Sequence, residues 1–220
     1  DNGTAFRNNI TTLFTNYSNG DWQGASGIDL GENATTNHHA NITGNILRTT
    51  QSAINLWSSF NIIEGNIVTM TAPFSAAIDF DVGPNPSTIN TYNNITNNVI
   101  YLVNNTALQA GIFFSTNFNN IINNTVTCSS CTNAAGIYTA LNHDNLIKNN
   151  IITINGSSSA GIVLAGSNET TAASSNVLLN NRVDLLAPSN RAIDFTFHQF
   201  DESVDGNASN NNFTNLRINI

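Results

Sequence analysis

Acidic side chains are the first candidates for chemistry in this chain. The densest cluster lies in the segment DFTFHQFDESVD, which contains Asp194, His198, Asp201, Glu202 and Asp205. Carboxylate oxygens at this density could bind calcium, with Asp201, Glu202 and Asp205 as ligands. The spacing does not match an EF-hand loop, and a solvated acidic loop explains the cluster more simply. We therefore predict no metal site and no cofactor.

Two aspartates at equivalent positions of a recurring motif, Asp29 and Asp79, are candidates for a catalytic pair. If each motif marks one coil of a repeat, they lie two coils, about 10 Å, apart. Retaining glycosidases hold their two carboxylates about 5–5.5 Å apart, and inverting enzymes up to about 9.5 Å. Asp81 could approach Asp79, but no Lys or Arg lies near either residue in the sequence. We predict no catalytic residues and expect a solvated sheet face here.

Cys128 and Cys131, in the segment CSSC, are the only cysteines. A redox motif of this spacing belongs to a βαβ unit, which the surrounding sequence does not show, and zinc needs two further ligands. We predict a disulfide between Cys128 and Cys131, formed in an oxidising compartment. Two free structural thiols are the alternative. His38, His39 and His143 give no metal motif, because adjacent histidines on a strand point to opposite faces.

The composition restricts the partners of the chain. Only 9% of its 220 residues are charged, and 6 Lys and Arg stand against 14 Asp and Glu, for a formal net charge of −8. So few cations cannot neutralise a run of phosphates, which argues against nucleic acid and against an anionic membrane surface as partners. No apolar run approaches the length of a membrane-spanning helix. We expect neither a nucleic-acid partner nor a membrane span.

A ten-residue repeat organises most of the chain. Its form is Asn-x-apolar-x-(Gly/Asn)-Asn-x-apolar-x-apolar, and its copies begin at Ala40, Asn61, Asn93, Asn119, Asn145, Asn176 and Asn211. Positions eight and ten alternate as on a strand with one buried face. Positions three and eight are also apolar in every copy. An odd number of residues separates them, which on a straight strand would place them on opposite faces, so a bend must lie between them. Gly or Asn at position five tolerates a left-handed backbone, which places the bend there.

Position six of the repeat predicts a ladder of side-chain amides along this bend: Asn45, Asn66, Asn98, Asn124, Asn150 and Asn181. Each such hydrogen bond contributes about 0.5–1.5 kcal/mol, whereas a buried unpaired amide costs about 1–3 kcal/mol. A second motif precedes most copies, with small residues before a central Ile28, Ile54, Ile78, Ile112, Ile137, Ile162 or Ile193. Small residues suit a place where a neighbouring backbone comes close. Two strand motifs per coil without a helical period indicate a stacked β-solenoid.

These repeats resemble those of the right-handed parallel β-helix proteins, the pectate-lyase-like superfamily, and in particular its NxIxxN carbohydrate-binding and sugar-hydrolase repeats. The resemblance implies an all-β, single-domain, right-handed parallel β-helix (β-solenoid) of about 7–8 coils with no capping helix. We expect residues 1–25 to form a degenerate first coil or an assembly segment, and residues 26–220 to form the β-helix. Proteins with such repeats include polysaccharide lyases, glycoside hydrolases, and surface-layer, adhesin and phage-spike proteins.

The chain contains twelve Asn-x-Ser/Thr sequons, and we predict N-linked glycans at ten of them: Asn2, Asn16, Asn33, Asn41, Asn94, Asn104, Asn155, Asn168, Asn207 and Asn212. Asn41, Asn94 and Asn212 share repeat position two, which faces outward. Asn9 and Asn123 are left out because they coincide with the predicted bend. The alternative is that a chain rich in Asn and Thr makes sequons by accident.

The sequence favours a structural function. The chain ends within a core repeat, with Ile218 and Ile220 at buried positions, and neither end shows a capping helix. Open sheet edges invite strand addition, and a head-to-tail contact of this kind makes a filament. We expect an extracellular or cell-surface, glycosylated subunit, with its signal peptide already removed. Its main partner would be itself, in a homopolymer that forms a surface filament or sheath.

The alternative is a polysaccharide-binding or polysaccharide-cleaving protein, a lyase or a glycoside hydrolase. It would use the side of the inserted segments Asp81–Tyr92, Ala165–Ser175 and Thr196–Asn210. Exposed aromatic residues on one face, such as Phe113 and Tyr138, would favour this function because sugars stack on aromatic rings. A third hypothesis, an ice- or crystal-binding face, needs a regular Thr ladder that the outward positions do not show.

Overall fold

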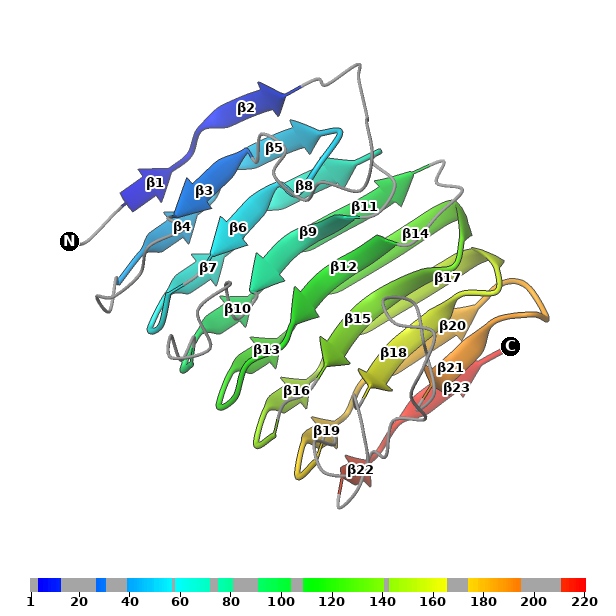
Figure 1. The fold of residues 1–220 in the computed structure, drawn as a ribbon. Coiled ribbons are helices and arrows are strands. Elements are labelled where there is room, and N and C mark those ends of the chain that lie inside the picture. The colour runs from blue at the N-terminus through cyan, green and yellow to red at the C-terminus, as the bar shows by residue number, and fades with distance from the viewer. Residues whose placement is uncertain are drawn as a thin grey trace.

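The computed structural model describes residues 4–12, 27–30, 39–56, 58–71, 75–80, 91–103, 109–140, 143–165, 174–194 and 211–220. These residues form β-strands and no helix. The strands fall into three sheets, which we name A, B and C, and neighbouring strands within each sheet run parallel (Figure 1).

Sheet A consists of β1 (Thr4–Phe6), β4 (Asn41–Thr43), β7 (Ile62–Glu64), β10 (Asn94–Thr96), β13 (Asn120–Ile122), β16 (Leu146–Lys148), β19 (Val177–Leu179) and β22 (Asn212–Thr214). Sheet B consists of β2 (Asn9–Thr12), β5 (Ile46–Thr49), β8 (Ile67–Met70), β11 (Val99–Val103), β14 (Thr125–Thr132), β17 (Ile151–Ser157), β20 (Arg182–Leu185) and β23 (Arg217–Asn219). Sheet C consists of β3 (Ile28–Leu30), β6 (Ile54–Leu56), β9 (Ser75–Phe80), β12 (Gln109–Phe114), β15 (Ala134–Ala140), β18 (Ala160–Ala165) and β21 (Arg191–Asp194).

Successive strands belong to different sheets, so the chain winds from sheet A to sheet B to sheet C and back. β1, β2 and β3 form the first coil, β19, β20 and β21 form the seventh, and β22 and β23 add part of an eighth. Each strand pairs with its equivalent in the next coil with like positions in register, as Ile95 pairs with Ile63 and Ile121. The prediction of an all-β parallel β-helix of 7–8 coils is confirmed (Figure 1).

Stacked aliphatic side chains fill the interior of the coils. In the fourth coil, Ile95, Ile100 and Ile112 project inward from the three sheets, and each is fully buried. Their equivalents in the second to sixth coils belong to the same continuous cluster, and Ile28 and Ile193 pack against it. In β23 and at the residue after it, Ile218 and Ile220 are 46% and 97% exposed, so the prediction that they are buried is wrong. The burial of β11 alternates along the strand, which confirms the period-two pattern at repeat positions eight and ten. The core is therefore a set of ladders, each built from one repeat position.

The bend between sheets A and B lies at repeat position five, as predicted. Its residue has a positive φ, between 50° and 65°, at Arg7, Gly44, Gly65, Asn97, Asn123, Asn149, Asn180 and Asn215. Glycine and asparagine adopt this conformation most readily, which explains their recurrence there. Asn9 lies two residues beyond Arg7, the bend residue of its coil, so the prediction that Asn9 coincides with the bend is wrong.

Each coil contains three strands although the sequence shows two strand motifs, because the bend divides the ten-residue repeat between sheets A and B. A second bend with positive φ, which the sequence did not indicate, lies between sheets C and A. Its residues are Phe60, Tyr92, Phe118, Asp144 and Ser175, with φ between 55° and 62°. The two bends thus share a backbone conformation but differ in residue type.

The small residues before the central Ile of sheet C lie where neighbouring backbones approach each other, which confirms that expectation. A Cβ on Gly111 would lie 2.6 Å from the carbonyl oxygen of Gly136. One on Gly136 would lie 2.7 Å from the carbonyl oxygen of Gly161 and 2.4 Å from Cγ2 of Ile152. Real Cβ atoms do not approach other atoms this closely, so glycine sets the fit between these coils.

Candidate functional site

The bend between sheets A and B carries the first candidate feature, a continuous row of buried asparagines. Nδ2 of Asn98 donates hydrogen bonds to Oδ1 of Asn124 (3.0 Å) and to the carbonyl oxygen of Ile63 (2.9 Å). Oδ1 of Asn98 accepts from the backbone N (3.0 Å) and from Nδ2 (2.9 Å) of Asn66. The side-chain amide therefore uses two donor hydrogens and both lone-pair directions of its oxygen.

The same bonding pattern runs along the whole row. It is repeated at Asn45, Asn66, Asn124 and Asn150, while Asn8 extends the row into the first coil and Asn181 ends it in the seventh. All members from Asn45 to Asn181 are buried. Since every bond reaches the coil before or after, the row links coils along the axis and not within one coil.

A second asparagine row, at repeat position one, follows the bend between sheets C and A. Oδ1 of Asn93 accepts from the backbone N (2.9 Å) and from Nδ2 (2.8 Å) of Asn61. Nδ2 of Asn93 in turn donates to Oδ1 of Asn119 (3.0 Å). Asn145 and Asn176 continue the row. This second row was not predicted, although Asn occupies position one in six of the seven copies of the repeat.

The outward row of sheet C holds the acids considered for catalysis. In register it reads Asp29, Asn55, Asp79, Phe113, Tyr138, Val163 and Asp194. Asp29 and Asp79 are thus two coils apart, as expected, and Asn55 lies between them. Asp81 lies outside the described residues.

The expectation of a solvated sheet face is wrong for the later part of this row, and Tyr138 does not meet the condition of exposure that would favour sugar binding. Tyr138 and Asp194 are each only 4% exposed, Val163 is fully buried, and Phe113 is half-buried. Ala76, Ala110, Ala135 and Ala160 pack with Phe113, Tyr138 and Val163 in a second hydrophobic cluster on the outside of sheet C. The rings of Phe113 and Tyr138 lie 5.4 Å apart in a tilted arrangement.

Burial governs the electrostatics of this cluster. The Asp194 carboxylate forms an ion pair with the exposed guanidinium of Arg191. Burial, and to a smaller extent the nearby negative charge of Asp194, raise the pKa of Tyr138 to about 12. Both effects disfavour the phenolate. The arrangement holds a neutral phenol and does not generate a base.

We expect the stability of the chain to fall as the pH rises from 10 to 12. An unfolded tyrosine titrates near pH 10, so in this window the folded chain binds more protons than the unfolded chain. The free energy of unfolding should therefore decrease by about 2–3 kcal/mol across it. Urea unfolding at pH 9 and pH 11.5 measures the change, and absorbance at 295 nm follows the phenolate. Tyr138→Phe should remove most of the slope, and an equal slope in this variant would contradict the assignment.

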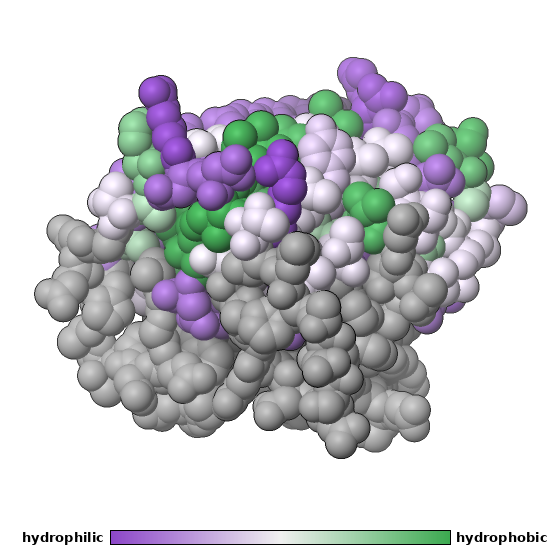
Figure 2. Space-filling model, turned by 90° about the horizontal axis from the view of Figure 1, so that it is seen from above, coloured by the Kyte–Doolittle hydropathy of each residue, from purple (hydrophilic) through white to green (hydrophobic). Residues whose placement is uncertain are grey.

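A row of aromatic side chains, which the sequence analysis missed, lies along the bend between sheets C and A. We name it the aromatic ridge, and it consists of His39, Phe60, Tyr92, Phe118 and His143. Phe60, Tyr92 and Phe118 stack with ring centroids 5.3 Å and 5.2 Å apart and planes within 10° of parallel. These three side chains remain 40%, 50% and 39% exposed. On the face drawn in Figure 2, hydrophobic residues form separate patches between hydrophilic residues.

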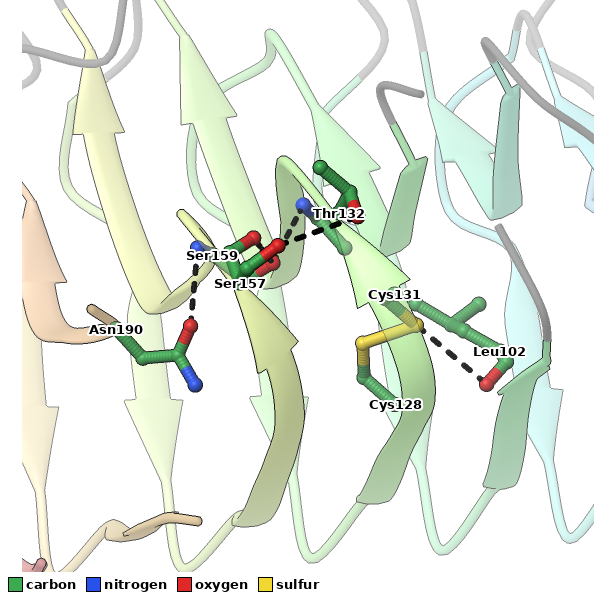
Figure 3. Close-up of a disulfide and its surroundings, with 8 residues drawn as sticks. Leu102, Cys128, Cys131, Thr132, Ser157, Ser159 and Asn190 are labelled. Atoms are coloured by element: carbon green, nitrogen blue, oxygen red, sulfur yellow. Dashed lines mark hydrogen bonds between the residues drawn. A yellow bond between two sulfur atoms is a disulfide. The ribbon is translucent and has the colours of Figure 1, made fainter. Parts of the chain in front are cut away.

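Cys128 and Cys131 are joined by a disulfide within β14, and both residues are buried. The bond spans the point where the register between β14 and β17 shifts, between Ser129 and Cys131 (Figure 3). Sγ of Cys131 contacts the carbonyl oxygen of Leu102 at 3.6 Å. The pair thus closes an irregular turn from sheet B toward sheet C, at the inside of the coil.

The predicted glycosylation sites are only partly described. Asn41, Asn155 and Asn212 are exposed, and Asn94 is half-buried with its Oδ1 accepting from Nδ2 of Asn120 (2.8 Å). Asn2, Asn16, Asn33, Asn104, Asn168 and Asn207 lie outside the described residues, as do the acids Asp201, Glu202 and Asp205. Among the described residues, no three His, Cys, Asp or Glu side chains gather in a way that could hold a metal ion.

Comparison with known proteins adds no relative. No protein-family model, curated protein or solved structure matches the chain. In the part of the chain that the structure describes, no helix is long and apolar enough to cross a membrane. What the structure shows of the resemblance to the pectate-lyase-like superfamily is the parallel β-helix arrangement of the strands.

Proposed function

We propose that the chain is a structural protein of the cell exterior: a glycosylated β-solenoid subunit that assembles head-to-tail into a surface filament or sheath. The observation that carries the proposal is the pair of continuous asparagine rows. Their amide bonds run from coil to coil, so each coil is held by the coils before and after it. Buried amides that bond from coil to coil along one axis suit a load-bearing rod.

The outer surface supports the same proposal. The outward acids Asp29 and Asp79 are two coils apart, and Asp194 is buried against Arg191. Three predicted glycan acceptors, Asn41, Asn155 and Asn212, are exposed on sheets A and B. Glycans on these faces would make a hydrated sheath and would limit edge-to-edge aggregation of a β-rich chain. Peptide mass spectrometry of the native protein tests occupancy at each asparagine.

Electron microscopy of the purified native protein tests the assembly directly. Negatively stained samples at several concentrations, without substrate, should contain long rods with a regular axial repeat. Short single rods at every concentration would contradict head-to-tail assembly. Rods that mild denaturant has fragmented should regrow once the denaturant is removed, if strand pairing continues from one subunit to the next.

A second candidate function, polysaccharide binding, is favoured by one observation on sheet C. The half-buried ring of Phe113 stands between Asp79 and Tyr138 in the outward row, so an aromatic ring and a carboxylate are neighbours on one face. Affinity electrophoresis in acidic and neutral polysaccharides tests this function, and the same samples can be assayed for cleavage. Phe113→Ala should abolish retardation, whereas Tyr101→Ala, which removes an exposed ring from sheet B, should not.

A further inference from the structure

The sequon at Asn9, which the sequence analysis left out, lies on an accessible outer face. Asn9 is the first residue of β2, at repeat position seven, and the bend of its coil is at Arg7. Because β2 is extended, Asn9 and Thr11 point to one face of sheet B and Ile10 points to the other. Asn9 and Thr11 are exposed, and Ile10 packs against the core. Both sequon side chains that matter for glycosylation thus face outward.

The side-chain amide of Asn9 is oriented by Arg48 in the second coil. Nη1 of Arg48 donates a hydrogen bond to Oδ1 of Asn9 at 3.2 Å. A guanidinium has donors and no acceptor, so it must face the oxygen of the amide and not its nitrogen. Among the described residues, none accepts a hydrogen bond from Nδ2 of Asn9. Nδ2, the atom that carries an N-linked glycan, is therefore turned away from Arg48.

Asn9 begins an outward row of sheet B that continues with aliphatic side chains. In register, the next residues of the row are Ile46, Ile67, Val99, Thr125 and Ile151. Ile46, Ile67 and Ile151 are 36%, 43% and 43% exposed. Exposed aliphatic side chains that follow one another on a sheet favour aggregation between faces. A hydrated group on Asn9 would lie directly beside Ile46, the first of them.

A glycan on Asn9 is compatible with strand pairing at the edge of the sheet. β2 lies at one end of sheet B (Figure 1). Side chains stand roughly perpendicular to a sheet, whereas the main-chain groups that pair with another strand lie in its plane. A glycan on the outward side chain of Asn9 therefore leaves the main chain of β2 open. Asn212, in β22 at the opposite end of sheet A, is exposed in the same way.

We propose that Asn9 is a further N-glycan acceptor and that its glycan covers the beginning of the aliphatic row at Ile46. This inference rests on the glycosylated exterior proposed above, since it needs the same glycosyl transfer. The donor is a lipid-linked sugar phosphate. The bond between its anomeric carbon and the phosphate oxygen breaks, a bond from that carbon to Nδ2 forms, and one amide proton leaves with the lipid phosphate. The hydroxyl of Thr11 is the part of the sequon that the transferase requires.

Mass spectrometry of intact glycopeptides from the native protein tests Asn9 separately from its neighbours. Cleavage after Arg7 and after Phe14 releases a peptide in which Asn9 begins the only sequon. We expect this peptide to carry added sugar mass, to give sugar ions on fragmentation, and to keep the first sugar on Asn9. Thr11→Ala should abolish the added mass, and the control Thr11→Ser, which keeps the hydroxyl, should retain it.

The other sequons separate failure of this inference from failure of the proposed function. A bare Asn9 peptide, in a sample whose Asn41, Asn155 or Asn212 peptides carry glycans, would overturn the assignment of Asn9 and leave the glycosylated exterior intact. Bare peptides at all four sites would contradict both. Binding of a hydrophobic dye tests the cover over Ile46. Thr11→Ala should bind more dye than Thr11→Ser, and equal binding would contradict that part of the proposal.

Discussion

Replacing Asn98 by alanine should lower the free energy of unfolding by about 3–6 kcal/mol, a large part of the 5–15 kcal/mol typical of a folded chain. The substitution removes the acceptor of the backbone N and Nδ2 of Asn66 and the donor to the carbonyl oxygen of Ile63. Asn66 and Asn98 are fully buried, so water cannot replace these partners without opening the bend. Each buried group left unpaired costs about 1–3 kcal/mol. Urea unfolding followed by circular dichroism measures the loss.

Two further variants separate the amide bonds from the volume of the side chain. Asn120 is an outward, half-buried asparagine of the next coil, and its Nδ2 donates one hydrogen bond to Oδ1 of Asn94. Asn120→Ala should therefore lower the free energy of unfolding by about 1 kcal/mol or less. Asn98→Asp keeps the shape but places a carboxylate oxygen against the carbonyl oxygen of Ile63 and Oδ1 of Asn124. Burial and these acceptors would raise the pKa of the new carboxyl, so its stability should be higher at pH 4 than at pH 7. An Asn98→Ala loss no greater than that of Asn120→Ala would contradict the role of the row.

The features that the sequence predicted are those that repeat with the coil. The ladders of Ile95 and Ile100, and the left-handed bend at Asn97, depend on contacts between equal positions of neighbouring coils. Such contacts impose the same residue type on every copy, so an internal alignment shows them. The second asparagine row, which includes Asn93, belongs to this class, and the alignment contained it. Asparagine is usually exposed, so its recurrence at position one does not by itself indicate a buried site.

The features that the sequence did not predict depend on contacts outside the repeat frame. The burial of Tyr138 and Asp194 depends on the outside of sheet C, where the outward position after the central Ile changes its residue type from coil to coil. The aromatic ridge depends on the bend before position one, and its members are separated by unequal stretches of sequence. Phe60, Tyr92 and Phe118 each stand directly before a repeat, which is the signal that could have found them.

Replacing Gly136 by valine should lower the free energy of unfolding by about 3 kcal/mol, the upper part of the usual range for overpacking. Valine favours strands, so a loss would come from space and not from backbone preference. The added Cβ would lie 2.4 Å from Cγ2 of Ile152 and 2.7 Å from the carbonyl oxygen of Gly161. The second contact is with backbone, which cannot turn away as a flexible side chain can. Thermal and urea unfolding of the purified variant measure the effect.

The control is a glycine with room around it. Gly65 has a φ of 63° and no atom within 4 Å of an added Cβ, and the equivalent residue in the next coil is Asn97. Gly65→Asn should therefore change stability by no more than about 0.5 kcal/mol. If Gly136→Val were as stable as Gly65→Asn, the backbone contact in sheet C would not set the spacing of the coils. If Gly136→Val is destabilised as expected, the asparagine rows and the sheet C glycines fix the same axial spacing between coils from different corners. A change at either place then strains the other.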